Sequence, residues 1–141
     1  MGTLNTRFTL RSSNLYRNSV AQRHDKVFAV ENLVENNVRV IKATSGSSPY
    51  EVASGTDYYD SDETGDFANR VFVFLRNTAT AAGKKITIQF NNNGTRDAVM
   101  SLNSGEFTYF PWICDAATDK LEVFSNDSDG VKLEYILTPM R

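Results

Sequence analysis

The sequence is poor in the residues that build disulfides and metal sites. It has one cysteine, Cys114, and one histidine, His24. One cysteine cannot form an internal disulfide, and one histidine removes most zinc sites. The two residues lie far apart in the chain, and no family signature surrounds either, so a nucleophile–base pair is not indicated. We therefore predict no metal site, no cofactor and a buried, structural cysteine.

Long hydrophobic runs are also missing. No apolar stretch approaches the roughly 20 residues that a transmembrane helix needs, and the first residues lack the apolar region of a secretory signal. The sequence contains no phosphate-binding glycine loop and neither of the hydrolase motifs HExxH and GxSxG. We expect a protein that is not an enzyme, has no membrane partner and is made in the cytoplasm.

Turn-forming and strand-surface residues are abundant. The chain has 141 residues, of which 38 are asparagine, threonine or serine. These side chains compete with helical hydrogen bonds and favour turns and exposed strand faces. The composition predicts an all-β protein, and the length suits one domain.

The C-terminal half shows the strand pattern most clearly. Apolar residues alternate, or run continuously, between short polar turns rich in asparagine and glycine. The last strand should face inward through Val131, Leu133, Tyr135 and Leu137, and Pro111 should place its own strand at a sheet edge. The predicted strands are Arg70–Arg76, Lys85–Phe90, Arg96–Leu102, Phe107–Cys114, Leu121–Ser125 and Val131–Leu137.

The N-terminal half has a weaker pattern. Residues 1–25 are predicted to be an extended basic arm, with one strand at Arg7–Arg11. Residues 26–141 then form a single sandwich domain that contains a long polar loop at 44–69. Further strands are expected at Lys26–Val34, Asn37–Ala43 and Tyr50–Ala53, with a turn at Glu35–Asn37. Eight or nine short strands predict an antiparallel β-sandwich, jelly-roll-like, with an extended N-terminal arm.

Charge is unevenly distributed along the chain. The net charge is −2, so bulk attraction to nucleic acid is weak and no nucleic-acid partner is predicted. Residues 1–42 hold seven basic against three acidic residues, and residues 43–141 hold eight against fourteen. Two readings remain open: two solvated stretches, or a basic arm that docks on an acidic surface or on another copy. The acidic residues at 57–66 only faintly resemble a calcium loop, and we expect a flexible acidic loop there.

Aromatic residues are concentrated in the segment FTYFPW at 107–112. Alternation places Phe107, Tyr109 and Pro111 on one face of the strand and Thr108, Phe110 and Trp112 on the other. One set should meet the core, and the other is a second core layer, an oligomer interface or a ligand face. A carbohydrate-binding module is therefore an alternative, with a sugar platform drawn from aromatic residues. The candidates for that platform are Tyr58, Tyr59, Tyr109 and Trp112.

The end of the chain resembles small virion structural proteins of tailed bacteriophages. The likeness is carried by the segments LNSGEFTYFPW and DKLEVFSNDSDGVKLEYIL, over about residues 70–138. Capsid decoration (cement) proteins and related jelly-roll virion proteins often carry a similar order of glycine, glutamate and proline followed by two closing strands. The residues concerned are Leu102, Gly105, Glu106, Pro111, Glu134 and Tyr135.

The resemblance implies a non-enzymatic virion protein, assembled in a bacterial cytoplasm, that binds the outer capsid surface and stabilises the shell. Its partner would be the major capsid protein or another virion protein, and it would form a homo-oligomer, a trimer being favoured. A tail, head–tail connector or spike component is the alternative within the virion. The predicted partner-binding residues are Arg7, Arg11, Arg17, Arg23, Tyr109 and Trp112.

Overall fold

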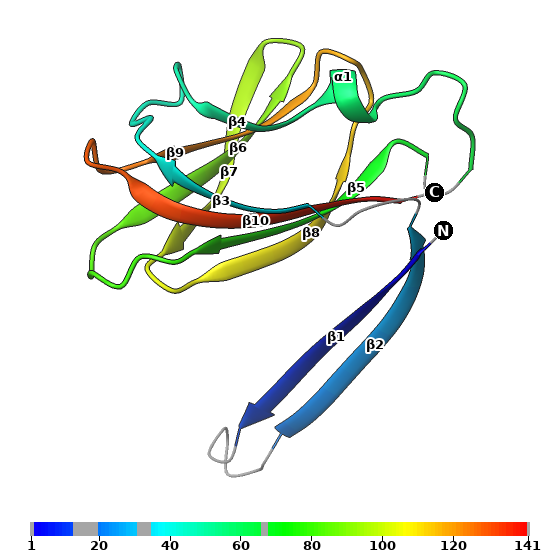
Figure 1. The fold of residues 1–141 in the computed structure, drawn as a ribbon, viewed down its shortest axis with the longest axis horizontal. Coiled ribbons are helices and arrows are strands. Elements are labelled where there is room, and N and C mark those ends of the chain that lie inside the picture. Colours follow the sequence, from blue (N-terminus) through cyan, green and yellow to red (C-terminus); the bar gives the residue numbers. More distant parts are fainter. Residues whose placement is uncertain (1, 13–19, 31–34, 66–67, 141) are drawn as a thin grey trace.

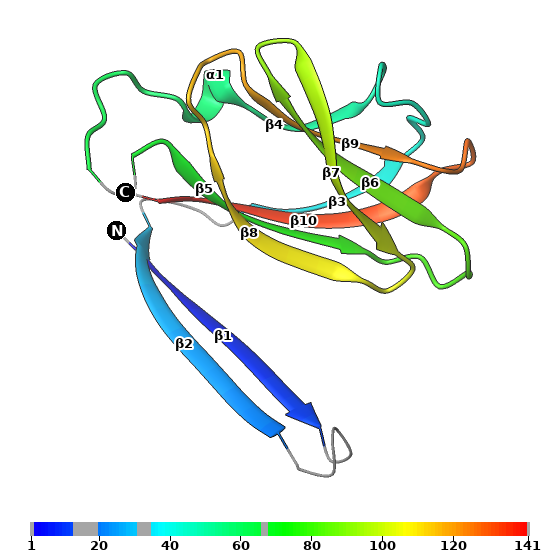
Figure 2. The same cartoon turned by 180° about the vertical axis from the view of Figure 1, so that it is seen from behind.

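The described chain consists of a β-sandwich and a separate β-ribbon (Figures 1 and 2). The computed structural model describes residues 2–12, 20–30, 35–65 and 68–140. Within these ranges lie ten strands and one short helix, α1 (Gly55–Tyr58). The strands are β1 (Gly2–Ser12), β2 (Val20–Val30), β3 (Glu35–Ile41), β4 (Tyr50–Ser54), β5 (Arg70–Asn77), β6 (Lys85–Asn92), β7 (Thr95–Asn103), β8 (Phe107–Ile113), β9 (Lys120–Ser125) and β10 (Val131–Met140).

The eight strands from β3 to β10 pair in a nested order. Antiparallel pairs join β3 to β10, β4 to β9, β5 to β8, and β6 to β7. Two more antiparallel pairs, β10 with β5 and β9 with β6, complete a sheet on each side. We call β3-β10-β5-β8 sheet I and β4-β9-β6-β7 sheet II. A long ribbon rolled into two packed sheets in this way is a jelly roll, so the predicted antiparallel all-β sandwich is confirmed.

The N-terminal strands form a two-stranded ribbon outside the sandwich. The register of β1 with β2 runs from Gly2↔Val30 to Ser12↔Val20. The ribbon meets the sandwich through the pairing of Val30 with Met140 at the end of β10. It projects from the end where both termini lie, on the side of sheet I, and diverges from that sheet (Figures 1 and 2). We call β1 and β2 together the ribbon.

Two boundaries predicted for the N-terminal half differ from the structure. The arm was expected to end at residue 25, but β2 runs on to Val30. The turn predicted at Glu35–Asn37 is wrong, because these residues begin β3 and pair with residues 135–137 of β10. Three consecutive polar residues resemble a turn locally, whereas the long-range ladder with β10 keeps them extended.

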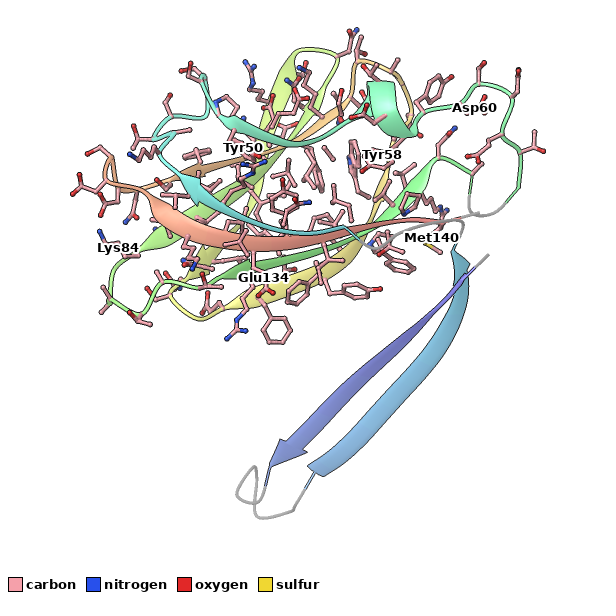
Figure 3. All side chains as sticks on the ribbon, viewed as in Figure 1. Tyr50, Tyr58, Asp60, Lys84, Glu134 and Met140 are labelled. Atoms are coloured by element: carbon pink, nitrogen blue, oxygen red, sulfur yellow. The ribbon has the colours of Figure 1, made fainter. Side chains whose placement is uncertain are left out.

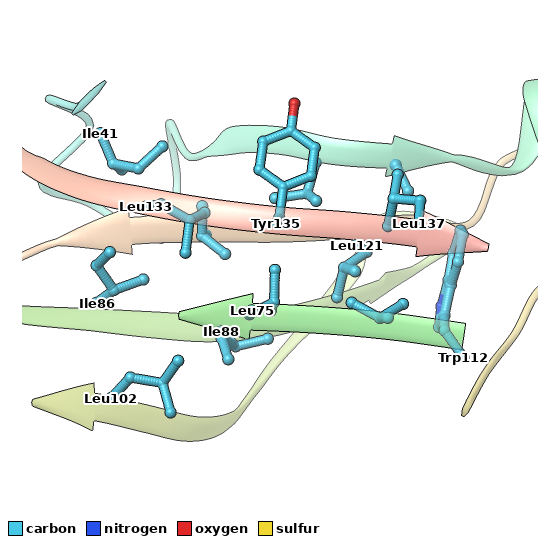
Figure 4. Close-up of a cluster of buried hydrophobic side chains, with 14 of the residues drawn as sticks. Ile41, Leu75, Ile86, Ile88, Leu102, Trp112, Leu121, Leu133, Tyr135 and Leu137 are labelled. Atoms are coloured by element: carbon cyan, nitrogen blue, oxygen red, sulfur yellow. The ribbon is translucent and has the colours of Figure 1, made fainter. Parts of the chain in front are cut away.

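The core lies between the two sheets (Figure 4). The inward set predicted for the last strand is confirmed, since Val131, Leu133, Tyr135 and Leu137 are all buried. Each fully buried aliphatic side chain stabilises the fold by about 1.5–3 kcal/mol relative to its exposed state. The side chains from sheet II that meet this set are Val52, Ala53, Ile86, Ile88, Leu102, Leu121 and Val123.

The polar connection at 44–69 contains ordered structure. The predicted short strand is confirmed as β4, and α1 follows it directly. The Ser54 hydroxyl caps this helix by accepting a hydrogen bond from the Thr56 amide at 3.3 Å. The Gly55 amide donates to the Asp119 carbonyl at 2.6 Å, which ties α1 to the loop before β9.

Strand β8 has two chemically different faces and lies at the edge of sheet I, as its proline predicted. Pro111 sits opposite Phe72 of β5, and β5 is the one strand with which β8 pairs in the described chain. Trp112 is 3% exposed and Phe110 packs against the core, whereas Phe107 is 60% exposed. The alternation predicted for FTYFPW is therefore confirmed.

The two faces of β8 should differ sharply in their contribution to stability. We expect Trp112→Ala to lower the free energy of unfolding by about 3–5 kcal/mol, because it leaves a cavity in the core. Phe107→Ser should lower it by under about 1 kcal/mol, because this ring is mostly in solvent. Urea unfolding of both variants measures the difference, and equal losses would contradict the assignment of the faces.

Candidate interaction surface

The outer face of sheet I carries most of the exposed apolar side chains. Among the described residues, six large hydrophobic side chains are exposed, and five of them belong to this sheet. The sixth, Val99, lies on β7 of sheet II. The five lie at the two edges of the sheet, Val38 and Val40 on β3 and the others on β8, with Glu134 and Arg76 between Val38 and Phe107. Exposed apolar side chains gathered on one face can mark an interaction site. We use the name outer patch for the five exposed residues of sheet I together with Phe74 and Ile136, which lie between them. The five exposed residues are Val38, Val40, Phe107, Tyr109 and Ile113.

Aromatic contacts between β5 and β8 order one side of the outer patch. The rings of Phe72 and Tyr109 stack with centroids 5.1 Å apart and planes 8° apart. The rings of Phe74 and Phe107 are 6.0 Å apart and inclined by 32°. Cross-strand aromatic pairs such as these stabilise a sheet and restrict the rotamers of its surface side chains. A partner would thus meet a flat, preordered aromatic surface.

Tyr109 is the predicted partner-binding residue that the structure places on this surface. It is 41% exposed, and the burial of the rest of the side chain raises the pKa of its phenol to about 12. The phenol is therefore protonated and uncharged at neutral pH. It can donate one hydrogen bond to a partner without a change of charge.

A single ion pair crosses the middle of the same face. Arg76 of β5 and Glu134 of β10 occupy paired positions, and their side chains approach to 4.0 Å. Surface pairs at this distance contribute little to stability. Lys132 precedes Glu134 by two positions on β10. It is exposed and is paired with Val40 of β3. This face thus carries more positive than negative charge, and its other exposed side chains are mainly apolar.

The ribbon register brings predicted basic residues together. Arg7 and Arg11 lie two positions apart on one face of β1, and Thr9 between them is opposite Arg23 of β2. Residues at alternate positions share a face of a β-ribbon, so the positions of these three arginines share one face, together with Asp25, which is opposite Arg7. Arg17, the fourth predicted residue, lies outside the described residues. We call this the basic face of the ribbon.

The opposite face of the ribbon holds apolar positions that the sequence reasoning only partly recognised. Leu4 is opposite Phe28, and Phe8 and Leu10 follow Leu4 on the same face of β1. The alternation of Phe8 and Leu10 indicated a strand, but β2 has no clear period of its own. Only the register with β1 shows that Phe28 is opposite Leu4. The same face also contains polar positions of β2, since Lys26 is opposite Thr6, His24 is opposite Phe8 and Gln22 is opposite Leu10.

Trp112 does not fit the partner-binding role expected for it. Its ring is buried, faces the core and packs edge-on to Tyr58, with centroids 6.4 Å apart. Tyr58 and Tyr59 also pack against the core and are partly buried. Of the four residues considered for a sugar platform, Tyr109 is the one on the outer patch. The expectation for Trp112 was not met because alternation assigns side chains to two faces of the strand but does not show which face meets the core.

The described carboxylates that are most enclosed serve the fold. Glu122 of β9 is 3% exposed and accepts hydrogen bonds from Gln89 at 2.7 Å, Asn91 at 2.9 Å and Arg96 at 3.0 Å. Gln89 in turn donates to the Gly46 carbonyl at 2.9 Å and so fixes the loop before β4. A carboxylate with every partner supplied by its own sheet and loop is a structural group.

The acidic loop and the cysteine also make local structural bonds. Asp60 accepts a hydrogen bond from the Asp62 amide at 2.9 Å, and Glu63 accepts one from the Asn69 amide at 3.0 Å. Within the described ranges, no group of three histidine, cysteine, aspartate or glutamate residues could hold a metal ion. Burial, with the negative charge of Asp119, raises the pKa of the Cys114 thiol to about 11, so this thiol is protonated at neutral pH.

Comparison of the chain with protein-family models, curated proteins and solved structures gave no match. No helix in the described part of the chain is long and apolar enough to cross a membrane. The interpretation of the outer patch and the ribbon therefore depends on their own chemistry.

The Glu122 network should make stability depend on pH. Burial alone would raise the pKa of Glu122, but hydrogen bonds from Asn91, Gln89 and Arg96, with the charge of Arg96, hold it below its ordinary value of 4.5. The ionised form therefore stabilises the fold above about pH 4.5, and this stabilisation is lost as the pH falls through the lowered pKa.

We expect Glu122→Gln to cost about 1–3 kcal/mol of unfolding free energy at pH 7. The cost should shrink as the pH falls below 4, where the wild-type carboxyl is itself becoming protonated. Urea unfolding of the two proteins at several pH values gives the difference directly. A cost that stays constant from pH 7 to pH 3 would show that the ionised carboxylate is not what stabilises the fold.

Proposed function

We propose that this protein is a non-enzymatic virion structural protein, most specifically a capsid decoration (cement) protein. The observation that carries the proposal is the combination of an exposed apolar patch on sheet I and a ribbon that projects on the same side of the sandwich. Both features suit attachment to a large protein surface. Figure 3 shows how the side chains of the sandwich surround the body of the molecule, with the ribbon standing apart from it.

The chemistry of the described groups supports binding rather than catalysis. The most enclosed carboxylate, Glu122, is held by three side chains of its own sheet, and the thiol of Cys114 is kept protonated. Catalytic acids and nucleophiles need a poised pKa and access to a reacting group. The outer patch, by contrast, offers area and shape, which are the requirements of an interface.

In the proposed mechanism, the surface of the sandwich and the ribbon have different binding roles. The sandwich packs against neighbouring copies through apolar sheet surface, a trimer being the favoured assembly. The basic face of the ribbon bridges adjacent subunits of the major capsid protein, or of another virion protein, on the outside of the shell. On a lattice, many such contacts act together, so that weak individual affinities give firm attachment. The resemblance of residues 70–138 to phage virion proteins supports a virion partner, of which we propose the capsid.

The copy number in the particle separates decoration from the alternative of a tail, connector or spike component. We expect quantitative mass spectrometry of purified particles to find this chain in hundreds of copies, in fixed ratio to the major capsid protein. A few copies or a few dozen copies per particle would favour the tail or connector alternative. Absence from the particles would contradict the virion proposal as a whole.

The basic face should contribute to binding of the shell. We expect Arg7→Ala with Arg11→Ala to weaken attachment to expanded capsids about tenfold, because each lost ion pair removes part of the electrostatic attraction. The matched control is Lys42→Ala with Lys85→Ala, which removes the same charge from exposed positions of the sandwich. Co-sedimentation with capsids at two salt concentrations measures both pairs, and equal weakening by the two pairs would contradict a specific role for the ribbon.

The carbohydrate-binding alternative has less structural support. Its platform needs several coplanar exposed aromatic rings, and three of its four candidate residues pack into or against the core. Tyr109 and Phe107 remain on the surface of β8, on a face whose other exposed apolar residues, Ile113, Val38 and Val40, are aliphatic. Such a patch is more typical of a protein interface.

A further inference from the structure

Three of the four edge strands of the sandwich carry a feature that disfavours the addition of a further strand. On β8, Pro111 has no backbone amide hydrogen to donate. The pairing of β4 skips Val52, and the pairing of β7 skips Val99, so both of these edges are irregular. Prolines and bulges of this kind keep exposed sheet edges from pairing with other chains.

Strand β3 is the edge that lacks such a feature. It pairs with β10 over seven consecutive positions, from Glu35↔Leu137 to Ile41↔Val131, without a shift of register. Among the described strands, β10 is the one with which β3 pairs, so the other side of β3 leaves its backbone amides and carbonyls open. At about 3.3 Å per residue this edge is about 23 Å long, which suits an added strand of about seven residues.

The side chains of β3 differ between its two faces. Val38 and Val40 are 51% and 55% exposed on the outer face of sheet I. Arg39 lies between them and therefore belongs to the opposite face, where it is paired with Leu133 of β10. Alternate side chains of an added strand would lie beside the two valines on one face and beside Arg39 on the other.

Arg39 is held by two tyrosines and not by a carboxylate. The hydroxyl oxygens of Tyr50 and Tyr135 are 3.3 Å apart. Hydrogen bonding with Tyr135, and then the charge of Tyr50, raise the pKa of the Arg39 guanidinium. In the part of the chain that the structure describes, no carboxylate forms an ion pair with Arg39. The exposed guanidinium therefore retains donors for an anionic group.

The charges near β3 decide which kind of strand fits its edge. Lys42, directly after β3, and Lys132, opposite Val40, are both exposed. A second copy fits poorly, because its β3 would bring another Arg39 and its β1 contains Arg7 and Arg11. Like charges across an interface disfavour binding, so the fitting strand is acidic and comes from a different protein.

We infer that the free edge of β3 binds an extended acidic segment of a partner protein, which adds a fifth strand to sheet I. Apolar residues of the segment lie beside Val38 and Val40, and a carboxylate between them binds Arg39. This inference goes beyond the proposed function, which assigns attachment to the outer surface of the sandwich and to the ribbon. It does not require the partner to be a capsid protein, so each can fail while the other stands.

The test titrates the full-length, nitrogen-15-labelled protein with synthetic peptides, and backbone amide resonances report where each peptide binds. The probe is the acetylated and amidated peptide VTVDVTV, which alternates apolar and polar residues around one aspartate. The peptide VTVNVTV removes only the charge. The peptide VTPDPTV keeps the charge but removes two backbone donors.

We expect the aspartate peptide to shift the amide resonances of residues 37–41 and to slow the hydrogen exchange of amides on the free edge of β3. The asparagine peptide should bind about tenfold more weakly, because it lacks the charge-assisted hydrogen bonds to Arg39. The proline peptide should also bind about tenfold more weakly, because it cannot complete the ladder.

Variants of the protein test the contact with the carboxylate. Arg39→Gln should weaken the aspartate peptide about tenfold and change the asparagine peptide less than twofold, since a double-mutant cycle isolates the pair. Arg39→Lys should restore part of the loss. The matched control is Arg76→Gln, which removes an arginine of the same sheet away from its edges and should change neither affinity more than twofold. Thermal unfolding checks that each variant is folded.

Four results would overturn the inference. The first is an absence of shifts at residues 37–41 with millimolar aspartate peptide. The second is equal binding of the proline peptide, which would exclude a backbone ladder. The third is equal weakening of both unbroken peptides by Arg39→Gln, which would give Arg39 a purely structural role. The fourth is a concentration-dependent shift of the same amides without peptide, which would assign the edge to a second copy.

Discussion

The structure depends on the period-two alternation of sheet I, which has apolar residues on both of its faces. The inward residues of β5 and β10 form one wall of the core, whereas Phe72, Phe74 and Ile136 belong to the opposite face. A sheet in a sandwich normally needs only one apolar face. The second apolar face therefore adds nothing to the core, and its side chains remain at the surface.

The outer side of sheet II differs from that of sheet I. Its outer side is occupied by the hydrogen-bonded network of Glu122, Gln89, Asn91 and Arg96, over which the loop at Gly46 is fixed. Polar groups that satisfy one another in this way need no external partner. The two outer surfaces of the sandwich thus differ in chemistry: a polar network occupies the outer side of β6 and β9, whereas sheet I carries most of the exposed apolar side chains.

The sequence allowed the class of the fold to be predicted, because alternation and turn residues act locally. The strands at Arg70–Arg76 and Val131–Leu137, the hidden strand near Tyr50 and the edge position of Pro111 all followed from neighbouring residues. The turn at Glu35–Asn37 was wrong because a partner strand nearly one hundred positions away decides its conformation. Trp112 was misplaced for a related reason: alternation separates two faces, but only the packing of distant strands shows which is buried. Which residues of β1 and β2 share a face depends on the register between the two strands, which the pattern of a single strand does not show.

Pro111 has a consequence for how an assembly of this protein can grow. The free edge of β8 lacks one backbone donor in the row that a further strand would need for a continuous ladder. Copies are therefore discouraged from adding edge to edge, which is the route to an endless sheet. A single residue without an amide hydrogen thus protects this edge of the sandwich against open-ended strand addition.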